Sequence, residues 1–212
     1  MLSSRPISRL PASLLLSAAL SAVAGVCAAS TITVSVTDKD GATVADAVVT
    51  LDSASGKQAV KPAAGVEMAQ VKRQFVPRVL VVPVGTPVSF PNQDSVRHQV
   101  YSFSPANTFE LKLYAGTPGE PVVFDKAGTA VLGCNIHDKM AAWIYVVETP
   151  YYGKTEVGGE IKLQQVPPGN YKLTVWHPAM PANTPPWQQA LTVGKTDLDS
   201  PVKLAVSAAS LP

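Results

Sequence analysis

The sequence predicts an all-β protein made of two small β-sandwiches. Beyond the first thirty residues it shows no helical period of useful length, and apolar residues come instead in short alternating or continuous runs. Turn residues separate these runs, in keeping with the 19 prolines and 14 glycines of the chain. Many short strands at this spacing are typical of sandwiches, and 212 residues suffice for one or two domains.

The composition excludes several classes of protein, and the missing motifs disfavour common hydrolases and nucleotide enzymes. A hydrophobic fraction of 46% excludes a disordered protein, and a charged fraction of 15% excludes a coiled coil. The formal net charge of +2 is too small to predict a basic surface that binds nucleic acid. The sequence has no Gly-rich phosphate loop, no GxSxG elbow and no HExxH motif. We therefore expect neither nucleic-acid binding nor an enzymatic activity.

The first 29 residues predict a cleaved secretory signal peptide. Arg5 and Arg9 give it a positive start, and residues 14–26 are almost entirely apolar or small. Small residues follow at positions 28–30, so cleavage is expected near residue 28 or 29 and leaves equal numbers of basic and acidic residues. No other stretch approaches membrane-spanning length, which predicts a periplasmic protein without stable membrane insertion.

The two cysteines have different expected fates. Cys27 would be lost with the signal peptide; a lipoprotein would keep it as its processed end, but Val26 is a poor residue to precede a lipidated cysteine. Cys134 then stands alone in an exported chain, where thiols normally pair or oxidise. It is either a buried bystander or a residue protected by a function, and its neighbours favour the second interpretation.

Strands and turns can be predicted in order along the chain. Apolar and polar residues alternate over residues 32–36, a turn follows at 38–41, and residues 44–51 form the second strand. Residues 53–64 are small and polar and are predicted to be a linker. The strands expected after it are short apolar runs at residues 79–82, 88–90, 98–101, 109–113, 122–124, 130–132 and 142–147.

The pattern of apolar and polar residues changes after Pro150. Residues 161–163 and 171–175 alternate on either side of a Pro-Pro-Gly-Asn turn. A proline-rich stretch and two weaker strands, around Leu191 and Leu204, complete the chain. His177 ends one of these strands and is predicted to be structural.

Residues 133–140 carry the chemistry. Cys134, His137 and Met140 fall within seven residues, between two apolar strands whose pairing would fix both ends of the loop. A thiolate, an imidazole and a thioether are soft or borderline ligands, the set that suits copper. A fourth ligand must come from elsewhere, and His98 is the best candidate because it follows a turn and opens a strand.

This pattern resembles the cupredoxins, the plastocyanin-like type 1 copper proteins. The resemblance includes Pro-Val-Gly-Thr at residues 83–86, Val-Ser-Phe at 88–90 and Phe-Asp-Lys-Ala-Gly-Thr at 124–129. It implies a Greek-key sandwich over residues 65–147 that holds one mononuclear copper. By position, the implied ligands are His98 and His137 as imidazoles, Cys134 as the short thiolate and Met140 as the weak axial thioether.

The sequence departs from plastocyanin at the loop. Only two residues separate His137 from Met140, where plastocyanin has four, and this puts the axial contact in question. The short spacing resembles the dinuclear copper-A loop, but that site needs a second cysteine at the position of Ala130, so a mononuclear centre is expected. Gln99 follows the first ligand histidine in place of a familiar asparagine.

The flanking segments resemble a second family. Residues 31–54 and 149–207, with a Val-Pro-Pro-Gly-x-Tyr turn, are similar to the carboxypeptidase regulatory-like, or transthyretin-like, Ig-type sandwich. The resemblance implies one discontinuous domain, with the cupredoxin inserted in it or adjacent to it. Chains of this combined type, with a GCxIHDxM loop followed by TPYY, resemble bacterial exported proteins of the methylamine-utilisation or plastocyanin-like type.

Together these features predict an exported copper protein that transfers single electrons between redox protein partners. The alternative is a periplasmic copper carrier or buffer without a role in electron transfer. A third hypothesis is a sandwich adhesion or carbohydrate module that holds no metal. An oxidase is least favoured, because one mononuclear site lacks the further coppers needed to reduce oxygen to water.

Overall fold

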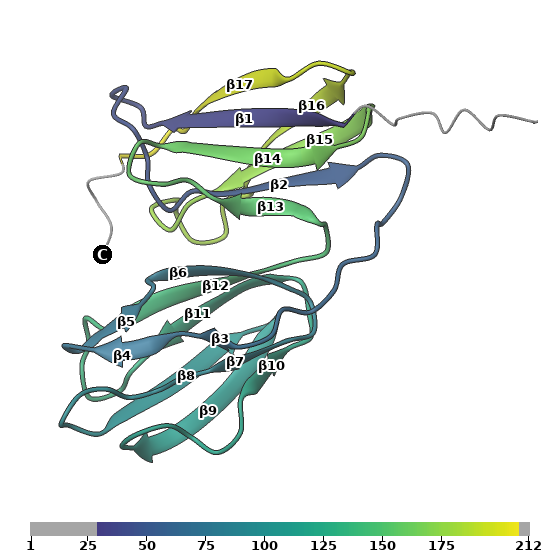
Figure 1. Cartoon of the computed structure of the whole chain (residues 1–212). Coiled ribbons are helices and arrows are strands. Elements are labelled where there is room, and N and C mark those ends of the chain that lie inside the picture. The colour runs from purple at the N-terminus through teal and green to yellow at the C-terminus, as the bar shows by residue number, and fades with distance from the viewer. Residues whose placement is uncertain (1–28, 208–212) are drawn as a thin grey trace, which may run out of the picture.

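The computed structural model describes residues 29–207, which form two stacked β-sandwiches joined by turns and loops (Figure 1). The all-β prediction is confirmed for this part of the chain. The predicted signal peptide lies outside the described residues, apart from Ala29. Within residues 29–207 no helix is long and apolar enough to cross a membrane.

The flanking sandwich is built from both ends of the described chain. Its two sheets have the strand orders β14-β1-β17 and β13-β2-β15-β16, and β1 pairs with β17 in parallel. Fifteen buried residues, including Val34, Leu51 and Leu173, form its core. The strands are β1 (Ser30–Thr37), β2 (Val48–Ser53), β13 (Tyr151–Lys154), β14 (Glu160–Val166), β15 (Gly169–Trp176), β16 (Trp187–Val193) and β17 (Leu198–Lys203).

The central sandwich lies between β2 and β13 in the sequence. A five-stranded sheet of order β6-β12-β11-β8-β9 packs against the sheet β10-β7-β3 over a second core, and β4 and β5 form a separate hairpin. Its strands are β3 (Val66–Glu67), β4 (Ala69–Val71), β5 (Gln74–Val76), β6 (Val79–Pro83), β7 (Thr86–Ser89), β8 (His98–Ser104), β9 (Asn107–Tyr114), β10 (Val122–Phe124), β11 (Gly128–Gly133) and β12 (Ala141–Val147).

Some elements differ from the sequence expectations. The second strand begins at Val48 rather than at residue 44, because a turn in which Asp46 has a φ of 59° precedes it. Strands β3, β4, β5 and β13 were not expected, since two to four residues are too few to show an alternation. The last strand ends before Leu204, which instead joins the core of the flanking sandwich.

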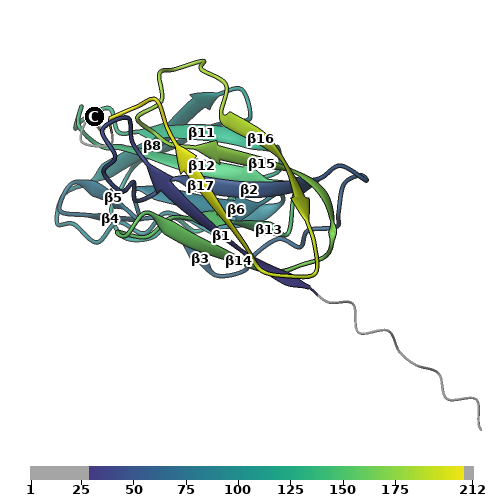
Figure 2. The same ribbon diagram turned by 90° about the horizontal axis from the view of Figure 1, so that it is seen from above.

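A small apolar cluster joins the two sandwiches. Val48 of β2 packs with Val79 of β6 and Trp143 of β12, two strands on the side of the central sandwich that faces the flanking one (Figure 1). In the view from above, the two sandwiches overlap (Figure 2). The ring centroids of Tyr145 and Trp176 lie 5.4 Å apart across this junction. Desolvation of such aromatic groups favours association of the two bodies.

A chain truncated after Val147 is expected to aggregate. The strand partners of β1 are β14 and β17, and those of β2 are β13 and β15, so the truncation removes all of them. Unpaired strand edges promote association between chains. Size-exclusion chromatography of the truncated chain, beside a control that ends at residue 207, measures this. Equal solubility and thermal stability of both chains would show that β1 and β2 do not need these partners.

Candidate metal centre

The loop that carries Cys134, His137 and Met140 is folded by two consecutive turns. The His137 amide donates to the Cys134 carbonyl at 3.3 Å, and the Met140 amide donates to the His137 carbonyl at 2.9 Å. Side chains three residues apart are brought to the same side by this kind of winding. The ends of the loop are fixed because Gly133, the last residue of β11, pairs with Ala141, the first residue of β12.

His98 is the first residue of β8, and its side chain reaches the same place. The side chains of His98, Val100 and Ser102 point inward and are buried, as the alternation of a strand requires. Opposite them the register shifts, since His98 faces Tyr114 while Val100 faces Leu111. This bulge turns Tyr114 inward and leaves Leu113 exposed, so it shapes the wall beside His98.

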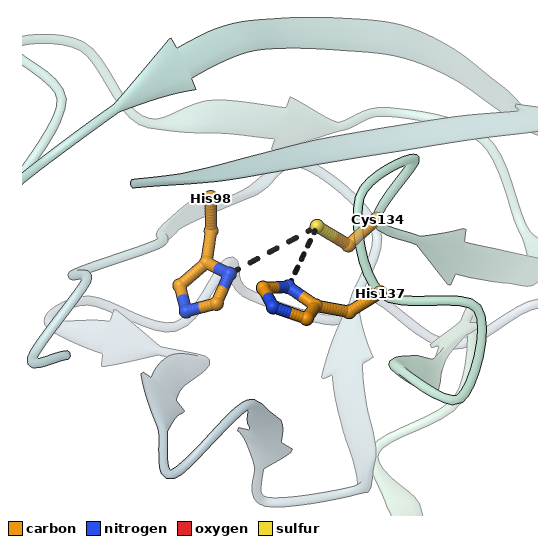
Figure 3. Close-up of side chains that lie close together, drawn as sticks. All are labelled: His98, Cys134 and His137. Atoms are coloured by element: carbon orange, nitrogen blue, oxygen red, sulfur yellow. Dashed lines mark hydrogen bonds between the residues drawn. The ribbon is translucent and has the colours of Figure 1, made fainter. Parts of the chain in front are cut away.

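The three side chains meet around the sulfur of Cys134 (Figure 3). Its Sγ lies 3.9 Å from Nδ1 of His98 and 4.0 Å from Nδ1 of His137, and the possible ligand atoms all lie within 4.8 Å of one another. His98 is 0% exposed and Cys134 is 3% exposed. The centroids of the two imidazole rings are 4.9 Å apart, and the ring planes are inclined by 57°.

These separations fit a metal ion. For a trigonal ion with metal–sulfur and metal–nitrogen bonds of about 2.3 and 2.0–2.1 Å, sulfur and nitrogen lie about 3.8 Å apart. The observed distances of 3.9 and 4.0 Å are close to this value. The donor set itself, one thiolate and two imidazoles, suits copper better than a hard cation.

Met140 belongs to the same buried neighbourhood. Its side chain is 2% exposed, and it packs in the same core cluster as Cys134. Both residues also line a surface cavity of about 510 Å³ beside the loop, together with Tyr101 and Gly133. The structure thus brings Met140 to the site, while its role as an axial ligand stays a prediction.

Asp94 is a neighbour of the site whose role the sequence did not reveal. One of its carboxylate oxygens lies 2.8 Å from Nε2 of His98, the ring nitrogen that points away from Cys134. Burial opposes ionisation of this carboxyl, but hydrogen bonds from the Arg73 amide, the His98 ring and the Lys72 amide outweigh it and lower the pKa of Asp94. The only sequence signal was an acidic residue four positions before the predicted ligand.

Tyr114 closes the site from β9. Its hydroxyl donates to the Phe90 carbonyl at 2.6 Å and accepts a hydrogen bond from the side-chain amide of Gln70. Burial raises the pKa of Tyr114 to about 12, against the opposing hydrogen bond from Gln70, and negative charge on Cys134 adds to the rise. Tyr114 therefore stays neutral and holds the wall of the site in place.

Gln99 and His177 have structural partners. The Gln99 side chain accepts from the side-chain amide of Asn135 at 2.8 Å and donates to the Glu110 carboxylate at 2.5 Å, which ties the metal loop to β8 and β9. His177 is buried in the flanking sandwich, where its Nδ1 accepts from the Ala179 amide at 3.2 Å. Burial lowers the pKa of His177, as expected for a neutral structural histidine.

No protein-family model and no curated protein matches this chain. A solved copper-containing nitrite reductase from Thermus scotoductus is 28% identical, with a TM-score of 0.38, over 44% of this chain and 26% of its own. A purple cupredoxin from Nitrosopumilus maritimus is 21% identical, with a TM-score of 0.35, over 39% of this chain and 99% of its own. An oxidized mutant of amicyanin is 18% identical, with a TM-score of 0.37, over 48% of this chain and 99% of its own.

The chain spans about a quarter of the nitrite reductase that it resembles and nearly the whole of the cupredoxin and of the amicyanin mutant. On its own geometry, the cluster of His98, Cys134, His137 and Met140 in an all-β sandwich is consistent with a type 1 copper site. The identity of the flanking sandwich stays a prediction.

Gly133→Ala is expected to destabilise the fold at this site. A Cβ on Gly133 would lie 2.6 Å from two atoms of the Tyr101 side chain, which packs directly over the residue that precedes Cys134. Overpacking in a core costs about 1–3 kcal/mol in the free energy of unfolding, and the cost here should lie at the low end, because the obstructing atoms are the far end of a half-buried side chain. Denaturant unfolding measures it, and Gly119→Ala, where no atom lies within 4 Å of an added Cβ, is the matched control.

The same clash can be tested by a double variant. Tyr101→Ala removes the ring that obstructs the new methyl group, so Gly133→Ala should cost less in that background than in the wild type. Strict additivity of the two substitutions would contradict the contact between Tyr101 and Gly133.

Proposed function

We propose that this protein is an exported, mononuclear copper protein that transfers single electrons between redox partners. The observation that supports the proposal best is the position of the Cys134 sulfur, between two imidazole nitrogens at 3.9 and 4.0 Å. Copper bound there would supply a one-electron couple. A thiolate with two imidazoles and a weak axial thioether is the donor set of electron-transfer copper sites.

The chain's own residues would keep this site rigid. His98 is buried on a strand, and the turns of the loop hold Cys134 and His137 on one side. A cluster that needs little rearrangement to bind an ion also needs little rearrangement when the charge of that ion changes. This property suits fast electron transfer.

His137 is the proposed point of contact with a partner. Unlike His98 it is only half-buried, and the neighbouring Ile136 is exposed by 51%. An apolar side chain beside the outermost ligand suits the small, transient interfaces of redox encounters. The partners are therefore expected to be redox proteins that dock at this loop.

The periplasmic location is proposed from the sequence of the first 29 residues, with their basic start and apolar run. The unpaired Cys134 agrees with it, since a buried thiol that binds a metal is protected from oxidation in an oxidising compartment. A copper carrier without electron transfer remains the alternative, and reversible electrochemistry separates the two.

Cupric ion added to the purified apoprotein is expected to bind in a ratio of one to one and to produce intense visible absorption. The absorption would arise from charge transfer between the Cys134 thiolate and copper. Cys134→Ser should abolish it and leave the far-ultraviolet circular dichroism unchanged. The spectrum of a serine variant that kept the same band would show that the ligand is another residue.

Electron transfer is tested on the same sample. Reversible one-electron voltammetry of the copper-loaded protein is expected if it is an electron carrier. Cuprous affinity far above cupric affinity, with slow oxidation by soluble acceptors, would instead favour the copper carrier.

Met140→Leu is expected to keep copper and colour but to change the potential and the electron-paramagnetic-resonance spectrum. The substitution conserves volume, so it should cost less than about 1.5 kcal/mol in stability. Met180→Leu is the matched control, because Met180 follows His177 by three residues, as Met140 follows His137. If the spectrum of the Met140→Leu variant were identical to that of the wild type, Met140 would only pack against the site.

A further inference from the structure

We propose that Asp94 is a positioning residue, which holds His98 in the tautomer that presents the lone pair of Nδ1 to the metal beside Cys134. This inference rests on the proposed copper site and goes further, because it assigns a function to a residue outside the four predicted ligands. Asp94 itself does not contact the metal position, since it lies on the opposite side of the imidazole ring.

The two nitrogens of His98 have distinct partners. Nε2 lies 2.8 Å from Oδ2 of Asp94, and Nδ1 lies 3.9 Å from Sγ of Cys134. An ionised carboxylate only accepts hydrogen bonds, so Nε2 must carry the proton. The neutral ring then has its lone pair on Nδ1, the nitrogen that faces the cluster.

The carboxylate is itself held by a distant hairpin. Its two oxygens accept from the backbone amides of Lys72 at 2.6 Å and Arg73 at 2.8 Å, at the tip of the hairpin formed by β4 and β5. Both residues have positive φ, 51° and 60°, as in the type I′ turn that suits a two-residue hairpin. This backbone geometry points both amides at Asp94.

The loop that carries Asp94 is fixed from its other side by Asn92. The Asn92 side chain accepts from the Asp94 amide at 3.0 Å and donates to the carbonyls of Val96 at 2.8 Å and Tyr114 at 3.1 Å. The Asp94 side chain is 14% exposed, so water competes little for its oxygens. Backbone amides, Asp94 and His98 thus form one continuous hydrogen-bonded chain that ends at the metal position.

This chain has a chemical consequence for a bound copper. A carboxylate that accepts the remote N–H of a ligating imidazole fixes the orientation of the ring and increases its basicity. A more basic nitrogen stabilises the cupric state more than the cuprous state. Asp94 should therefore lower the reduction potential as well as strengthen metal binding.

The tautomer can be measured without any metal. In apoprotein labelled with ¹⁵N at histidine, long-range proton–nitrogen correlation spectra at pH 8 should show His98 as the Nε2–H tautomer. Asp94→Ala removes the acceptor and should return His98 toward the mixture of tautomers of a free imidazole, with a measurable fraction of the Nδ1–H form. Asp94→Asn, which keeps one carbonyl acceptor, should lie between them, and it provides a second variant if the alanine substitution impairs folding. Asp125→Ala, an exposed carboxylate on the same sandwich, should change nothing.

The copper-loaded protein provides the second measurement. Loss of a partner of this kind typically reduces metal affinity by about 10–100-fold. We expect a loss of this size for cupric ion in Asp94→Ala, a smaller loss for cuprous ion and therefore a higher potential. Each tenfold difference between the two losses corresponds to about 59 mV.

The two proposals fail in different ways. An Nδ1–H tautomer of His98 in the wild-type apoprotein would overturn the role of Asp94, whether or not copper binds. A change in copper affinity in Asp94→Ala without a change in tautomer would also overturn it, because charge alone would then be sufficient. Wild-type protein that binds no copper would overturn the proposed function, and the apoprotein spectra would still decide the role of Asp94.

Discussion

The pairing of β11 with β12 is the constraint on which the rest of the site depends. It closes a loop of seven residues between Gly133 and Ala141, and the two turns inside that loop leave Cys134 and His137 little freedom to separate. Ordering these groups costs conformational entropy, and strand pairing and core burial offset that cost. The loop therefore supplies two of the proposed ligands already arranged, and β8, which pairs with β11, supplies His98.

The surroundings of the cluster divide into two kinds. On the side of Cys134, which is itself 3% exposed, lie apolar groups, among them Met140. On the far side of His98 lies a polar network that begins at backbone amides and passes through Asp94. Such a network is effective only when each buried polar atom has a partner. The Cys134 thiolate, which would form the most covalent bond to copper, thus lies on one side, and the polar groups that would set the orientation of the His98 ring lie on the other.

The sequence alone was sufficient to predict the fold class and the four residues that gather. Three of these residues are close neighbours in the chain, and the alternation around His98 indicated a strand. The sequence could not reveal the role of Asp94, because its partners are backbone amides 21 and 22 residues away at the tip of a hairpin whose strands have only three residues each. The contact of Tyr101 with Gly133 was equally invisible, since it depends on which strands are neighbours in the sheet.

The interrupted flanking sandwich has a consequence for the order in which the chain acquires its structure. Ser30 of β1 pairs with Val166 of β14, so closing this sandwich in an unfolded chain would require a loop of more than a hundred residues. Loop closure becomes less favourable with length, and contacts distant in sequence form slowly. The central sandwich draws its contacts from one continuous segment, and both ends of that segment bond to the turn at residues 84–86, Ala63 to Thr86 and Val147 to Val84. Folding should therefore proceed from the middle of the chain outward, with β1 and β2 unpaired until the last strands arrive.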